Sequence, residues 1–119
     1  MLTFGGDRIF LVAGATDMRK SFNGLSGIVR ERLNADPMSR HLFLFCNRQR
    51  NRLKVLISDE SGTWVLSKRL DGGTFAWPAA TDDVARIEYR EEQLALLLHG
   101  FDAEGLRARR WKRRILQRA

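Results

Sequence analysis

The sequence predicts an α+β protein: a small antiparallel β-meander sheet with one longer N-terminal helix and one short C-terminal helix packed on one face, and a basic C-terminal tail. Three observations support this fold class. Short apolar or alternating segments, separated by turn residues, occupy the middle of the chain, as strands of an antiparallel sheet do. An amphipathic helical pattern precedes them, and a shorter one follows. The 119 residues suffice for one domain, which we expect at residues 1–105, with the tail at 106–119.

The first two elements are a strand and a helix. Residues 8–13 (RIFLVA) are apolar and partly β-branched, a composition that favours a strand. Beyond Gly14, apolar residues recur at spacings of three and four, which predicts an amphipathic helix of roughly four turns that Thr16 or Asp17 would cap. The apolar positions of this helix are Met18, Phe22, Leu25, Ile28, Val29 and Leu33.

The middle of the chain forms the predicted meander. Leu42–Cys46 is a continuous apolar run, and Arg52–Ser58 alternates, with Leu53, Val55 and Ile57 on one side. Residues 63–70 and 74–77 complete the set, with polar or glycine-rich turns between the strands and a proline as the final stop. We therefore expect three or four neighbouring antiparallel strands.

The region after Pro78 allows two interpretations. In the first, residues 85–89 (ARIEY) form a short strand and Glu91–His99 forms the short C-terminal helix, with glutamates at its positive end and Gly100 as its C-terminal cap. In the second, one helix runs continuously over residues 82–99. The sequence favours the first.

The charge of the chain is concentrated at its C-terminal end. The net charge is +7, and residues 106–119 contain seven basic and no acidic side chains, so the preceding residues are neutral overall. A charge-balanced body joined to a polycationic segment is typical of proteins that bind an acidic polymer.

Two sets of residues are candidates for nucleic-acid contact. In an extended chain Arg48, Arg50, Arg52 and Lys54 point the same way, and such a row can bind phosphates, although charges also protect exposed strand edges. The tail combines guanidinium groups, which pair with phosphate bidentately, with a tryptophan that can stack on a base; the alternative is a tail that docks on a partner protein. The tail candidates are Arg107, Arg109, Arg110, Trp111, Lys112, Arg113 and Arg114.

Residue types needed for catalysis or metal binding are sparse. We assign no catalytic residue and no metal site, and we expect no cofactor. Asp59 and Asp71 fall at turns, where aspartate is favoured for backbone reasons, and one cysteine with two distant histidines cannot build a zinc site. Cys46 lies in an apolar strand, as expected of a buried thiol in a reducing cytoplasm. No apolar run is long enough to span a bilayer, so we expect a cytoplasmic protein without a membrane partner.

Several blocks of sequence together resemble one family. In order, these blocks are residues 16–25 (TDMRKSFNGL), Asp36-Pro37, residues 42–45 (LFLF) with Asn47-Arg48, residues 52–56 (RLKVL), residues 68–70 (KRL) and residues 73–78 (GTFAWP). Over about residues 9–100 the chain is similar to the TnpB, or Orf2-like, accessory proteins of the IS66 family of bacterial insertion sequences. The cationic positions of that family correspond here to Arg19, Lys20, Arg48, Arg52, Lys54, Lys68 and Arg69. The chain departs from the family pattern at Ser21, Ile57, Ser58 and Ala76.

The resemblance implies a small protein encoded beside a separate, larger transposase and required with it for efficient transposition. Together with the charges, it predicts a non-catalytic accessory protein that binds DNA electrostatically, at element ends or at a target, and assists the cognate transposase. Self-association is left open. The alternatives are an adaptor that binds the transposase without touching DNA, and a metal-dependent nuclease.

Overall fold

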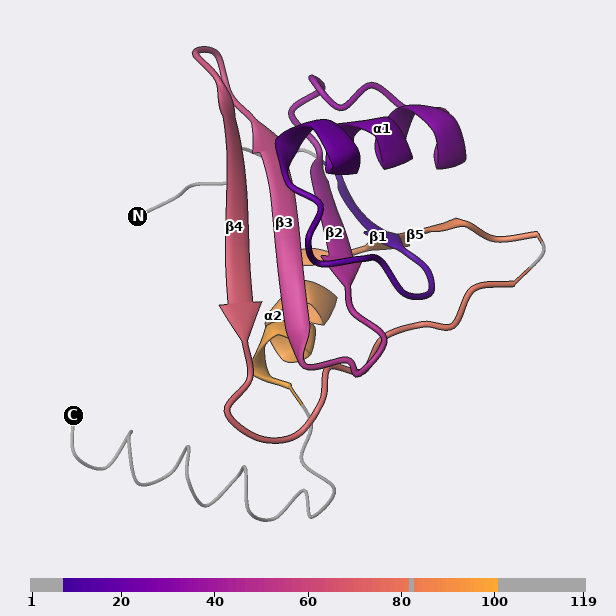
Figure 1. Ribbon diagram of the computed structural model, residues 1–119, viewed down its shortest axis with the longest axis vertical. Helices are drawn as coiled ribbons and strands as arrows, with labels where there is room; N and C mark the ends of the chain where they lie inside the picture. Colours follow the sequence, from indigo (N-terminus) through magenta and orange to yellow (C-terminus); the bar gives the residue numbers. More distant parts are fainter. Residues whose placement is uncertain (1–7, 82, 101–119) are drawn as a thin grey trace.

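The structure is a computed structural model that describes residues 8–81 and 83–100 of the chain. Within these residues, five strands form one sheet, and two helices pack on it (Figure 1). In chain order the elements are β1 (Ile9–Val12), α1 (Phe22–Arg32), β2 (Leu42–Cys46), β3 (Arg52–Ser58), β4 (Thr63–Arg69), β5 (Arg86–Tyr89) and α2 (Glu91–His99). The strand order across the sheet is β4-β3-β2-β1-β5, so β4 and β5 form the two edges.

The sheet is mixed, and the predicted antiparallel meander is wrong as a description of the whole fold. β1 and β2 are parallel, with Ile9 opposite Leu42, whereas β5 pairs antiparallel with the other side of β1. The cause is α1, because a helical connection between two neighbouring strands carries the chain back before the second strand begins. The meander exists only in the antiparallel run β2, β3 and β4.

The two helices cover opposite faces of the sheet, whereas both were expected on one face. The α1 face contains the buried side chains of Phe10, Val12, Leu25, Val29, Leu33, Phe43, Phe45 and Leu56. The α2 face contains the buried side chains of Ile9, Leu11, Leu42, Leu44, Cys46, Leu53, Val55, Phe75, Trp77 and Leu97. Every residue of β1 and β2 is buried, because side chains alternate between two faces that are both covered.

α1 is shorter than predicted and begins later. It contains 11 residues and starts after Ser21, whose side chain makes no capping hydrogen bond. The predicted cap at Thr16 or Asp17 is wrong, because the Asp17 carboxylate instead accepts hydrogen bonds from the backbone N–H and the guanidinium of Arg19.

β5 and α2 confirm the first of the two interpretations of the region after Pro78. α2 spans Glu91–His99 as predicted. At its start the Arg90 N–H donates to Oε1 of Gln93 (2.8 Å), and at its end Gly100 has a φ of 74°, a conformation that favours glycine. No helix in residues 8–81 and 83–100 is long and apolar enough to cross a membrane.

Candidate nucleic-acid interface

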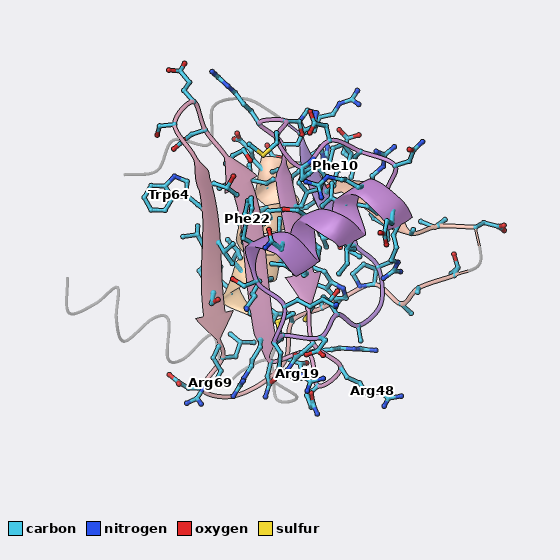
Figure 2. All side chains as sticks on the ribbon, turned by 45° about the horizontal axis from the view of Figure 1, so that its top comes forward. Phe10, Arg19, Phe22, Arg48, Trp64 and Arg69 are labelled. Atoms are coloured by element: carbon cyan, nitrogen blue, oxygen red, sulfur yellow. The ribbon has the colours of Figure 1, made fainter. Side chains whose placement is uncertain are left out.

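Eight of the predicted cationic residues meet at one end of the sheet. β1, β2 and β4 finish at this end and β3 begins there, because β1 and β2 are parallel and β3 is antiparallel to both of its neighbours. Figure 2 shows Arg19, Arg48 and Arg69 together along the lower edge of the molecule. We call this group the basic end; it comprises Arg19, Lys20, Arg48, Arg50, Arg52, Lys54, Lys68 and Arg69.

The cations do not form the single row that strand alternation predicted. Arg52 and Lys54 do share the α1 face of β3, and Arg69 of β4 lies directly opposite Arg52 on that face. Arg48 and Arg50 belong instead to the turn between β2 and β3, where Arg50 has a left-handed φ of 60°. The predicted row therefore holds for two of its four members, and the turn places the other two at the tip.

A single asparagine organises that turn. Asn47 Oδ1 accepts hydrogen bonds from the backbone N–H groups of Asn51 and Arg52 (both 3.0 Å), and its Nδ2 donates to Asn51 Oδ1 (2.7 Å). Asparagine side chains stabilise turns in this way by bonding the backbone a few residues on. Arg48 and Arg50 are thereby held on an ordered turn with their side chains exposed.

The turn is also hydrogen-bonded to residues 73–78, which we call the supporting loop. The prediction of a fourth strand at residues 74–77 is wrong: Phe75 is fully buried, and its N–H donates to the backbone oxygen of Arg50 (2.7 Å). The indole N–H of Trp77 donates to the backbone oxygens of Val12 and Gly14 (both 3.0 Å). Phe75 and Trp77 therefore position the basic end, a role that the sequence reasoning missed although their glycine- and proline-flanked motif marked them.

The loop between β1 and α1 is attached to the same end. The N–H of Thr16 donates to the backbone oxygen of Cys46, at the end of β2 (2.7 Å), and Nζ of Lys54 donates to the backbone oxygen of Lys20 (2.7 Å). Gly24 permits the close approach of Lys20 to α1, because a Cβ atom at this glycine would lie 3.0 Å from the lysine side chain. Lys54 is thus both a surface cation and a link between β3 and this loop.

Most of the cations lack a carboxylate partner in the part of the chain that the structure describes. Its three ion pairs join Arg8 to Glu88, Arg19 to Asp17 and Arg40 to Glu60. Among the eight cations, only Arg19 takes part, and its hydrogen bond lowers the pKa of Asp17 to about 2 and raises the pKa of the guanidinium. Arg52 and Arg69 lie opposite one another on neighbouring strands, and neither has a carboxylate partner among the described residues. Their like charges therefore repel and leave positive charge uncompensated on the α1 face.

Lys68 differs from the other seven cations. It lies on the α2 face, where its Nζ donates to the backbone oxygen of Leu98 in the last turn of α2 (2.7 Å). Such a contact satisfies a free carbonyl and suits the negative end of the helix. In this structure Lys68 therefore links β4 to the end of α2. The tail candidates, residues 107–114, lie outside the described residues.

Of the side chains considered for catalysis or metal binding, those of Asp59, His41 and Cys46 lie apart from one another, and each is either hydrogen-bonded or buried. Asp59 lies at the opposite end of the sheet from the basic end, and a hydrogen bond from the indole N–H of Trp64, with others from its own turn, lowers the pKa of its carboxyl. Burial raises the pKa of the Cys46 thiol to about 11, and His41 accepts a hydrogen bond from the backbone of Arg8. Residues 8–81 and 83–100 contain no group of three or more side chains that could hold a metal ion.

Comparison with known proteins identifies the family. A family model described as IS66 Orf2-like protein matches residues 7–108. The chain is 40% identical over 95 residues to the uncharacterized protein y4hO of Sinorhizobium fredii, a match covering 80% of this chain and 81% of that protein. It is 32% identical over 97 residues to the uncharacterized protein y4jC of the same organism, covering 82% and 81% respectively. No solved structure matches significantly. The chain belongs to the IS66 Orf2-like family of transposition accessory proteins.

Proposed function

We propose that the basic end binds the phosphate backbone of DNA, and that the protein thereby assists a transposase acting on the same DNA. One observation carries the proposal: cations from four separate segments of the chain converge at one end of the sheet, and among the described residues only Arg19 has a carboxylate partner there. A group of repelling cations on an ordered scaffold is stabilised when a polyanion binds it.

The expected mechanism is electrostatic rather than chemical. A phosphate placed between Arg52 and Arg69 relieves their mutual repulsion, and guanidinium groups can bind its oxygens bidentately. Arg48 and Arg50, on the turn, extend the contact to neighbouring phosphates. Binding of this kind releases counterions and is independent of base sequence, so it suits a protein that leaves sequence recognition to its partner. The seven cations of the tail would add to the same attraction.

A salt titration of DNA binding tests this proposal. We expect full-length protein to bind a fluorescent random-sequence duplex in an anisotropy assay, with an affinity that falls steeply as salt rises. Replacing Arg48 and Arg52 together by alanine should lower the slope of log K against log salt by roughly 2, because two phosphate contacts are removed.

The matched control removes the same charge elsewhere. Arg30 and Arg32 lie in the last turn of α1, after which the chain reaches Pro37 beside Ser58, at the end of β3 away from the basic end. Their double replacement by alanine should leave the salt slope unchanged. Equal losses in the two double variants would show that only net charge matters, which contradicts a site at the basic end. Absence of binding at low salt would favour the adaptor, which a pull-down of the cognate transposase without DNA would then reveal.

A further inference from the structure

The two edges of the sheet differ in how well they are protected against further pairing. β5 is four residues long and carries two charged residues, of which Glu88 forms an ion pair with Arg8. β4 is seven residues long and pairs with β3 along its whole length without a bulge or a proline. No described residue pairs with the outer side of β4. A long, regular edge strand is a template for another strand.

The backbone groups available on this edge follow from the hydrogen bonds on the inner side. The N–H of Leu70 donates to Asn51, and the oxygen of Gly62 accepts from Asp59, so both residues face β3. Because neighbouring residues in a strand alternate, the outward groups belong to the odd-numbered residues between them. These are Thr63, Val65, Ser67 and Arg69.

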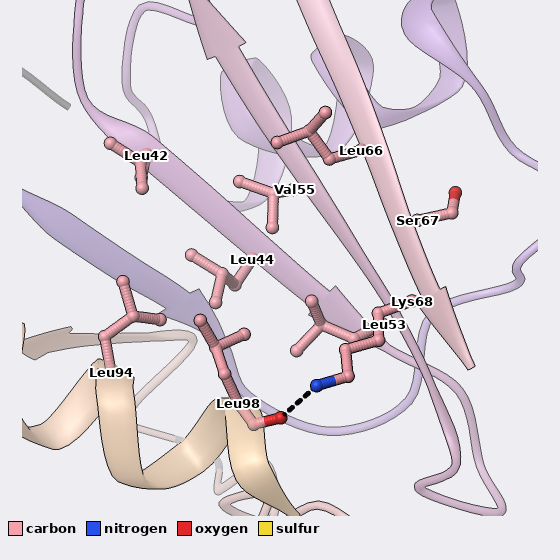
Figure 3. A pocket seen from close by; sticks show the side chains of 9 residues that line it. All are labelled: Leu42, Leu44, Leu53, Val55, Leu66, Ser67, Lys68, Leu94 and Leu98. Atoms are coloured by element: carbon pink, nitrogen blue, oxygen red, sulfur yellow. Dashed lines mark hydrogen bonds between the residues drawn. The ribbon is translucent and has the colours of Figure 1, made fainter. Parts of the chain in front are cut away.

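The same edge borders apolar surface that the other described residues leave partly uncovered. Trp64 is 48% exposed, and Leu66 is half-buried beside a groove of about 160 Å³ between β4 and α2. Figure 3 shows the groove with Leu94 and Leu98 of α2 on one side and Leu66 and Lys68 of β4 on the other. A strand added to β4 would extend the wall of this groove.

We propose that β4 pairs antiparallel with β4 of a second copy of this chain, about a two-fold axis at Leu66, so that the two five-stranded sheets become continuous. In this register Val65 lies opposite Ser67 of the second copy, and Thr63 lies opposite Arg69. All four residues with outward backbone groups then form hydrogen-bonded pairs, and the two Leu66 side chains meet at the axis, on the α2 face.

Charge complementarity selects a second copy in this orientation. The antiparallel arrangement places Trp64 opposite Lys68 of the second copy, whose alkyl chain can cover the indole ring while its ammonium keeps the hydrogen bond to Leu98. It also brings Arg69 of each copy next to the β3–β4 turn of the other, which carries Asp59 and Glu60. A parallel arrangement would instead put the two acidic turns together and the two basic ends together, and like charges would oppose it.

Sedimentation equilibrium of the full chain without DNA tests the dimer. We expect the wild type to approach twice its chain mass of 13.7 kDa, and Ser67→Pro to sediment as a monomer. Ser67 is exposed and its N–H points outward, so proline removes an intermolecular donor while leaving the β3–β4 ladder intact, a position where edge strands tolerate proline. Ser67→Ala is the matched control and should remain dimeric. Circular dichroism of both variants checks that the fold is kept.

A cysteine cross-link tests the register. Leu66→Cys places two thiols across a non-hydrogen-bonded pair, where the Cα separation of roughly 4.5 Å suits a disulfide. Mild oxidation should therefore give a covalent dimer, whereas Gln49→Cys, at the basic end, should not; the native Cys46 is buried and does not interfere.

Three results would overturn the proposal: a wild type that is monomeric at every concentration, a Ser67→Pro variant that stays dimeric, or failure of Leu66→Cys to cross-link. A monomer whose binding to the transposase is weakened by Ser67→Pro would show that the edge takes a strand of that protein instead. Because DNA is absent from these measurements, their outcome does not depend on the proposed DNA binding.

Discussion

At the scale of single residues, Asp17 supplies the one carboxylate that pairs with a cation of the basic end among the described residues. Its carboxylate binds the Arg19 guanidinium through Oδ2 (2.7 Å) and the Arg19 backbone N–H through Oδ1 (2.9 Å). The hydrogen bonds from Arg19 hold the pKa of Asp17 at about 2, so the carboxylate stays charged at all physiological pH values. If the basic end binds DNA as proposed, Asp17 competes with phosphate for the Arg19 guanidinium.

Asp17→Asn should therefore strengthen DNA binding. Asparagine keeps an oxygen that can accept the backbone N–H, so the loop is retained while Arg19 is released. We expect tighter binding at low salt and an increase of about 1 in the salt slope, measured by anisotropy. Asp17 is ionised at both pH 6 and pH 8, so the gain in affinity should be the same at the two values. The gain should shrink only at acid pH, between the ordinary aspartate pKa of 3.8 and the lowered pKa of about 2, where the wild-type carboxyl takes up a proton.

Asp36→Asn is the control for this variant. Asp36 also accepts a backbone N–H two residues on, from Met38 (2.9 Å), but it has no cation partner among the described residues and lies away from the basic end. The change in net charge is identical. If both variants strengthen binding equally, Asp17 has no local role.

At the scale of elements, the supporting loop connects the core to the basic end. It contributes a buried phenylalanine to the α2-face core and an indole that hydrogen-bonds the end of β1. Loops without regular structure can still be rigid when their backbone and side chains are bonded to the scaffold in this way. The positions of Arg50 and of the β1–α1 loop thus depend on residues that carry no charge.

Trp77→Phe should expose this dependence as a loss of stability. The aromatic character is kept, but the indole N–H loses its buried hydrogen bond to the oxygen of Val12 and its partly buried one to the oxygen of Gly14, which costs about 1–3 kcal/mol in the free energy of unfolding. Urea denaturation measures the change. Tyr89→Phe is the comparison, since its hydroxyl makes no hydrogen bond within the described residues, and it should shift the midpoint little. A Trp77→Phe variant as stable as the wild type would contradict the role of the indole.

The elements could be predicted from the sequence more readily than their arrangement. Alternation located β3 correctly, and caps and charge located α2. An alternating pattern, however, does not say which strand is the neighbour, and so the parallel β1–β2 pair was missed. The signal for coverage on both faces was present in the unbroken apolar runs IFLV and LFLFC, which are typical of strands buried on both sides.

The candidate site was predictable in its parts but not as a whole. Strand alternation was enough to place Arg52 and Lys54 on one face. The meeting of these two residues with Arg19, Arg48 and Arg69 depends on the direction of four strands, which only the tertiary structure provides. Phe75 and Trp77 were assigned to a strand because apolar residues between a glycine pair and a proline resemble one; their role depends on contacts with residues far away in sequence.

At the scale of the whole molecule, the described charges are arranged along the strand direction. The basic end has one ion pair, whereas the other end holds the paired residues Arg40 and Glu60 as well as Asp59. In the proposed antiparallel dimer, the two basic ends point in opposite directions at diagonal corners of one long sheet. Such a dimer would present two of the proposed DNA sites, as a protein that holds two segments of a mobile DNA element together would require.

The wild type should therefore bridge two duplexes. We expect energy transfer between a donor-labelled and an acceptor-labelled duplex when the protein is added at low salt, because each basic end takes one duplex. Ser67→Pro should bind either duplex in the anisotropy assay without producing transfer, since the monomer has one basic end. Arg48→Ala with Arg52→Ala should lower both signals, because it weakens each site but leaves the β4 edge intact. Transfer that persists in Ser67→Pro would mean that a single chain bridges the duplexes, and the geometry proposed for the dimer would then not explain bridging.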